Sequence, residues 1–228
     1  MQKLLTLLQV NDSMFPIGSF THSYGLESYV DARIVNDNSS AAEYARTMLE
    51  HSIYYNDAAF LYKTLCLPAG KKGWDQLTEL DTLVTAIKAS YEIRDASKKL
   101  AIRFLKLTME LKPYPACKKY AEAIRQSALH GHYAIAFGLY VKAAGIATED
   151  ALSAFYYNTL NGIITNCAKA VPISQTAGQK ILFNLQPVIA RLVKKQKDMD
   201  EQQLGLCCIG QEIKCMQHEK LRTRIYIS

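Results

Sequence analysis

The stretch YEIRDASKKLAIRFLKLTMEL, residues 91–111, decides the fold class. At 100° per residue its charged side chains fall into one narrow stripe, and most of the remaining circumference is apolar. The stripe consists of Lys99, Arg103, Lys106 and Glu110, and the apolar rows contain Leu100, Phe104, Leu107 and Leu111 on one side and Ile102, Leu105 and Met109 on the other. We therefore expect a helix that other helices surround at the centre of a bundle, and we interpret the charged stripe as a solvated face.

The rest of the chain favours helices as well, because apolar residues recur at intervals of three and four more often than two, and strand signals are sparse. We expect helices over 3–10, 57–67, 74–88, 116–129 and 131–145. Others should begin after caps at Ser19 or Thr21, at Ser39 or Ser40, at Thr148, and at Ser174 or Thr176. The sequence thus predicts an all-α, single-domain bundle of about ten helices over 1–228, with a central buried helix and a flexible C-terminal tail.

Composition excludes several classes of protein. The chain has 228 residues, 49% of them hydrophobic, and no Pro/Gly/Ser-rich linker, which favours one substantial core. The formal charge of +6 is dispersed, so we expect no nucleic-acid binding. The most apolar stretch, 133–147, is interrupted by Lys142 and is too short to cross a membrane. Six cysteines without a CxxC pair, and the absence of a secretory signal, predict a soluble cytoplasmic protein with reduced thiols.

Motifs for catalysis and for metal binding are missing. There is no GxxxxGK[ST] phosphate loop and no GxSxG element. His218 and Glu219 lack the second histidine of a zinc protease motif, and His130 and His132 would diverge on a helix. We therefore expect no catalytic residue, no metal site and no cofactor, although an enzyme is only unsupported and not excluded.

One expected helix, which begins near Thr148, carries an unusual polar face. Asn158, Asn161, Thr165 and Lys169 recur at spacings of three, four and four, with Gly162 beside them. An ordinary solvated face would carry Lys and Glu, so these small polar residues favour close approach of another element. That element can be a second subunit or another helix of the same chain, and the sequence leaves both open.

Five blocks along the chain resemble the UreF family of urease accessory proteins. They are DSMFPIGSFTHSYGLESYV (12–30), EIRDASKKLAIRF (92–104), GHYAIAFGLYVKAAGI (131–146), CAKAVPISQTAGQKIL (167–182) and MQHEKLRTRIYIS (216–228). Departures are mild, since Phe20 stands where some members have Tyr and Lys169 where many have Arg. The resemblance implies an all-α dimer that binds UreD (also called UreH) and recruits the GTPase UreG. It implies a role in urease maturation, in which nickel reaches the urease apoprotein by transit through the complex and the protein holds no resident metal.

The resemblance also suggests partner-binding residues. Phe20, His22 and Tyr24 lie in the first block, where the alternative is that the aromatic rings are core. Lys169 lies in the fourth block, where it can pair with a carboxylate of a partner. The alternative is that its side chain lies along the end of its own helix, where the positive charge favours the helix dipole. Residues 218–228 alternate polar and apolar side chains, and we predict that they form a docking tail ordered by partners. Its candidate contact residues are His218, Glu219, Arg222, Arg224 and Tyr226, and the alternative is a disordered end without a role.

Two other functions compete with this partner-binding chaperone. A nickel-storing or nickel-binding protein that acts without a GTPase would be expected to have dense His or Cys tracts, whereas the five histidines here are scattered. A nucleic-acid binder would be expected to cluster its Lys and Arg residues. The scaffold function is therefore preferred, with nickel storage as the alternative.

Overall fold

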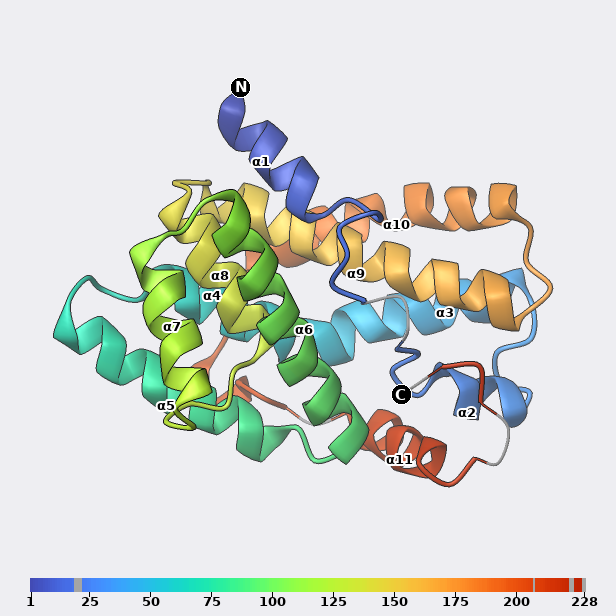
Figure 1. Ribbon diagram of the computed structural model, residues 1–228. Coiled ribbons are helices and arrows are strands. Elements are labelled where there is room, and N and C mark those ends of the chain that lie inside the picture. Colours follow the sequence, from blue (N-terminus) through green and yellow to red (C-terminus); the bar gives the residue numbers. More distant parts are fainter. Residues whose placement is uncertain (19–21, 207, 222–223, 227–228) are drawn as a thin grey trace.

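A computed structural model describes residues 1–18, 22–206, 208–221 and 224–226. Within these residues the chain consists of helices and loops and contains no β-strand (Figure 1). In chain order the elements are α1 (Gln2–Val10), α2 (Leu26–Asp31), α3 (Asn38–Thr47), the π-helix η2 (Met48–Ile53), α4 (Asp57–Cys66), α5 (Lys71–Ile87), α6 (Tyr91–Leu111), α7 (Pro115–Arg125), α8 (Tyr133–Ala143), α9 (Thr148–Ala170), α10 (Gln175–Gln196), the 3₁₀-helix η3 (Glu201–Gln203) and α11 (Ile209–His218). The predicted all-α class is confirmed.

Capping chemistry explains where several helices begin. The Ser174 hydroxyl accepts the Ala177 amide at 3.1 Å and caps α10, as predicted. The cap of α3 is Asp37 and not Ser39 or Ser40, because the Asp37 carboxylate accepts the Ser40 amide at 2.8 Å. Helix α9 starts at Thr148 itself, so the prediction that this residue is the cap is wrong.

The helix expected after Ser19 or Thr21 is much shorter than predicted. Tyr24 has φ 52° and Gly25 has φ 82°, both in the left-handed region, so α2 cannot begin before Leu26. Gly25 is required there for a second reason, because a Cβ at this position would lie 2.8 Å from the Cys215 sulfur. This turn brings the start of α2 against α11.

The central helix is α8 and not α6. Every residue of α8 from Ala134 to Val141 is buried, whereas Ile102 and Leu111 on α6 are 52% and 53% exposed. The prediction that other helices surround 91–111 is wrong. A helix with apolar side chains on two sides can leave one of those sides exposed to solvent. Phe104 of α6 does reach the core, where its ring meets that of Tyr133 edge-on at 5.6 Å.

The arrangement of the helices separates the two described ends of the chain. Helices α9 and α10 lie side by side, and α1 projects from the body at the top of Figure 1. Helices α2 and α11 lie next to each other on the opposite side, near the C-terminal label. None of the residues of α11 belongs to the main hydrophobic core, so polar contacts must contribute much of its attachment.

Candidate functional site

Glu27, in the first turn of α2, receives three contacts from the C-terminal part of the chain. One carboxylate oxygen, Oε2, lies 2.8 Å from His218 Nε2 and accepts the Tyr226 amide at 3.1 Å. The other oxygen, Oε1, accepts the Ile225 amide at 2.7 Å. The carboxylate thereby links the end of α11 to the described residues that follow it.

Glu92, in the first turn of α6, contacts the same segment from the other side. Its Oε2 lies 2.6 Å from His218 Nδ1, and its Oε1 accepts a hydrogen bond from Arg224 Nη1 at 2.7 Å. His218 is completely buried between the two carboxylates. Both ring nitrogens therefore lie within hydrogen-bond distance of a carboxylate oxygen.

The four residues Glu27, Glu92, His218 and Arg224 are called the C-terminal cluster below. Two carboxylates face one imidazole and one guanidinium, and each carboxylate is hydrogen-bonded to at least two groups of the C-terminal segment. Buried charges are tolerated when they are paired and hydrogen-bonded in this way. The cluster therefore explains how an element outside the hydrophobic core can be attached to the body.

Asn166 on α9 forms hydrogen bonds with both Tyr226 and His22 and so links them. The buried Tyr226 hydroxyl donates to the Asn166 carbonyl at 3.3 Å, and the Asn166 amide donates to the His22 carbonyl at 2.8 Å. Burial raises the pKa of Tyr226 to about 12, which keeps the hydroxyl protonated. Burial, and then the nearby Lys99 and Arg103 cations, lower the pKa of His22, so its imidazole is neutral at pH 7.

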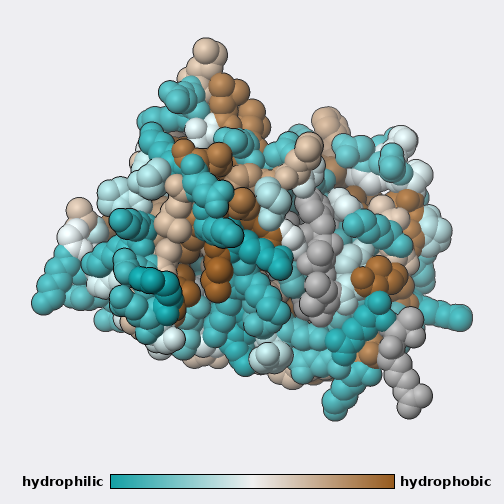
Figure 2. Space-filling model, viewed as in Figure 1, coloured by the Kyte–Doolittle hydropathy of each residue, from teal (hydrophilic) through white to brown (hydrophobic). Residues whose placement is uncertain are grey.

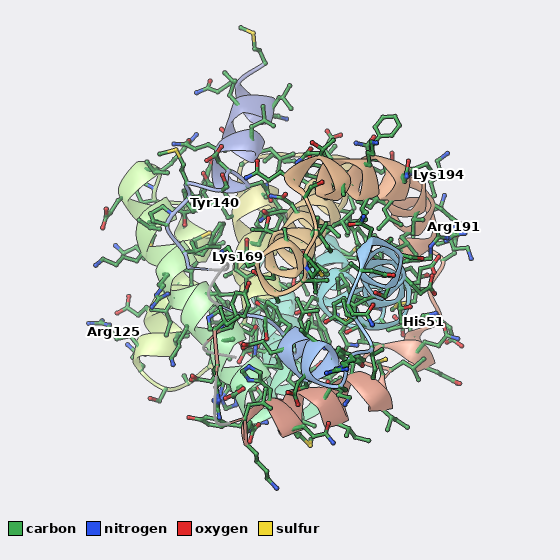
Figure 3. The ribbon with its side chains drawn as sticks, turned by 90° about the vertical axis from the view of Figure 1, so that its right-hand side faces the viewer. His51, Arg125, Tyr140, Lys169, Arg191 and Lys194 are labelled. Atoms are coloured by element: carbon green, nitrogen blue, oxygen red, sulfur yellow. The ribbon has the colours of Figure 1, made fainter. Side chains whose placement is uncertain are left out.

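Three other predicted partner residues lie close to this arrangement. Lys169 is exposed, three residues after Asn166, at the end of α9 that faces the viewer in Figure 3. The Glu219 carboxylate accepts from the Ser90 hydroxyl at 3.4 Å, and its carbonyl accepts from Arg224. The Tyr24 carbonyl accepts the Gln211 side-chain amide. The structure thus brings residues of the first, fourth and last blocks to one side of the molecule.

Phe20 and Arg222 lie outside the described residues. The predicted docking segment 218–228 starts inside a helix, because α11 extends to His218. In the described part of this segment, His218 and Tyr226 are buried within the chain, whereas Arg224 is partly exposed and Ile225 is exposed. A docking role for the segment stays a prediction, and in its described part Glu219, Lys220, Arg224 and Ile225 offer surface for it.

Sequence reasoning missed Glu27, Glu92 and Asn166. Glu27 and Glu92 have an ordinary interpretation, since an acidic residue in a first turn favours the helix dipole, and Asn166 is a single amide inside the long helix α9. The available signal was their position: Glu27 and Glu92 both lie in blocks that carry the family resemblance.

The polar face of α9 does not mark a close crossing at Gly162. A Cβ at Gly162 would meet no atom within 4 Å, whereas a Cβ at Gly178 of α10 would lie 3.1 Å from Ile164. Close approach of α9 and α10 therefore uses Gly178. The second explanation of the face, contact with another subunit, stays a prediction.

Neither a metal cluster nor a membrane span was found in the part of the chain that the structure describes. No three or more His, Cys, Asp or Glu residues there are grouped so that they could hold a metal ion. None of its helices combines the length and the hydropathy needed to cross a bilayer.

Helix α1 carries an exposed apolar face. Leu7 and Val10 pack into the core, while Leu4, Leu5 and Leu8 are 58–59% exposed. Figure 2 shows apolar side chains along this projecting helix at the top of the molecule. Exposed apolar groups at this density are typical of surfaces that bind another protein.

Comparison with known proteins gives one consistent family. The UreF family model matches residues 35–186. A Haemophilus influenzae (strain PittGG) protein named urease accessory protein UreF is 39% identical over 223 residues, which are 97% of this chain and 94% of the relative. Proteins of the same name from Actinobacillus pleuropneumoniae serotype 5b (strain L20) and Bacillus sp. (strain TB-90) are 37% and 31% identical, each over 100% of both chains.

Proposed function

Because the chain belongs to the UreF family, and the relatives described above are named urease accessory proteins, we propose that it is a non-catalytic scaffold for urease maturation. In this proposal it forms a dimer, binds UreD (UreH) and recruits the GTPase UreG, so that nickel is inserted into the urease apoprotein. Nickel is a cargo of the complex, and the chain itself needs no cofactor. The setting is the cytoplasm.

The observation that carries the proposal is the exposed apolar face of α1. The helix is anchored through Leu7 and Val10, so Leu4, Leu5 and Leu8 are presented on a fixed support. Covering a leucine side chain that is about half exposed stabilises a complex by roughly 1 kcal/mol. Three such residues together can contribute about a hundredfold in affinity.

The test is a double variant of this face, Leu4→Ser with Leu8→Ser. We expect unchanged helical circular dichroism and at least a tenfold loss of binding to UreD, to UreG or to both, measured by pull-down of the purified proteins. The matched control is Gln2→Ser with Gln9→Ser, which changes two exposed polar residues of the same helix. Equal recovery of both partners by the leucine variant and the control would contradict a role for this face.

The alternative of nickel storage makes a different prediction. A storage protein alone should give a stoichiometric nickel isotherm with submicromolar affinity, whereas a scaffold should not. Calorimetry on the isolated protein distinguishes them. A tight isotherm would put nickel storage ahead of the scaffold.

A further inference from the structure

A cavity of about 130 Å³ lies where the segment before α2, helix α9 and helix α11 meet. Ser23 and Tyr24 line it from the first segment, Asn158 and Asn166 from α9, and Gln211 and Cys215 from α11. One water molecule needs roughly 10–15 Å³ of cavity volume measured in the same way, so the cavity can hold several water molecules. Asn158 is itself only partly buried.

Polar atoms without a partner are concentrated at this cavity. Among the described residues, five buried side-chain oxygens have no hydrogen-bond partner within the protein. Four of them belong to residues that line the cavity: Ser23 Oγ, Tyr133 Oη, Asn166 Oδ1 and Gln211 Oε1. Four buried polar groups without hydrogen bonds would cancel a large part of the small net stability of a domain. We therefore expect a ligand that forms hydrogen bonds with them.

The orientation of the two amides is fixed by their nitrogen atoms. Asn166 Nδ2 donates to the His22 carbonyl at 2.8 Å, and Gln211 Nε2 donates to the Tyr24 carbonyl and to the Cys215 sulfur, the latter at 3.3 Å. Both amide oxygens are therefore left as acceptors. Burial raises the pKa of Tyr133, so its hydroxyl stays protonated and can also donate. The ligand must offer both donors and acceptors.

Charges around the cavity indicate that this ligand is neutral. Lys88 and Asp57 line it but pair with each other at 3.0 Å. Glu212, also in the lining, accepts the Ser90 amide at 3.2 Å. His22 is neutral at pH 7 because burial and nearby cations lower its pKa. Water meets these requirements, since it is small and neutral and both donates and accepts.

We propose that this cavity binds a cluster of ordered water molecules that completes the hydrogen bonds of Ser23, Tyr133, Asn166 and Gln211. The water cluster attaches α11 to the body near the start of the helix, at Gln211. The C-terminal cluster attaches the end of the helix, at His218. Two of the three buried residues of α11, Gln211 and Cys215, line the cavity, and the third is His218. The water cluster and the ion pairs thus add to the direct hydrogen bonds that attach this helix, such as the one from the Ser28 hydroxyl to the Lys214 carbonyl at 2.8 Å.

The first test is a high-resolution crystal structure of the full chain, with and without xenon pressure. We expect separate water peaks at about 2.7–3.2 Å from the four oxygens and no xenon in the cavity. Xenon occupancy would show a dry cavity and overturn the proposal. Continuous density from a larger solute bonded to the same oxygens would also overturn it.

The second test is the Tyr133→Phe variant, which removes one of the four oxygens. If water bonds this hydroxyl, the melting temperature should fall slightly or stay the same, and a clear rise would overturn the proposal, because removal of an unmet buried hydroxyl stabilises a protein. The control is Tyr120→Phe, since the Tyr120 hydroxyl donates to Asp81 at 2.6 Å within the protein. This control should lower the melting temperature by several degrees.

Discussion

Replacing Glu27 by alanine should release the C-terminal end of the chain from the body. The change removes the partner of His218 Nε2 at 2.8 Å and the acceptor of the Ile225 and Tyr226 amides at 2.7 and 3.1 Å. Breaking a buried pair by removing one partner costs about 3–5 kcal/mol. Since α11 lies outside the main core, this cost should appear as local opening and not as global unfolding.

Hydrogen exchange provides the assay. At 1.4 kcal/mol for each factor of ten, the amides of Ile225 and Tyr226 should exchange about a hundredfold faster or more in Glu27→Ala, while amides of α8 stay protected. The matched control is Glu122→Ala, which removes an exposed ion pair to Arg125 and should cost less than about 1 kcal/mol. If the two C-terminal amides exchange at the wild-type rate in Glu27→Ala, the cluster does not hold this segment.

Three other expectations concern pH and partner binding. Burial lowers the pKa of His132 to about 3, so the folded state excludes a proton that the unfolded state binds below about 6.5. The stability that this group contributes is therefore present above pH 6.5 and declines as the pH falls. Between pH 6.5 and 5 the free energy of unfolding of wild type, measured with denaturant, should fall by about 1.5 kcal/mol more than that of His132→Gln. Equal decreases in the two proteins would refute this expectation. Lys169→Glu should lower urease activation in a reconstituted assay far more than it lowers the melting temperature, with exposed Lys180→Glu as control; equal losses in both measurements would indicate a structural residue. Arg224→Ala should weaken recovery of UreD or UreG in pull-downs by about tenfold, and recovery equal to that of Arg125→Ala would remove Arg224 from the docking surface.

Sequence reasoning located the helices well where the signal is local. The 91–111 segment is a helix with the predicted bounds, because amphipathic spacing and the flanking turn residues act within a few residues of each other. The same reasoning misplaced the start of α2. Tyr24 has a left-handed backbone, which tyrosine rarely adopts, so its identity does not predict that conformation. Sequence reasoning also chose the wrong central helix, since the cover over Ile102 depends on which other helices lie there.

The sequence by itself determined the all-α class and, through five ordered blocks, the family. It could not assemble the C-terminal cluster, in which His218 meets residues 191 and 126 positions away, Glu27 and Glu92. Seen locally, both glutamates are ordinary first-turn residues, and His218 is one histidine at the end of a helix. Only the tertiary structure brings them together, because a contact between distant residues depends on how whole helices pack, and local propensity carries no record of that packing.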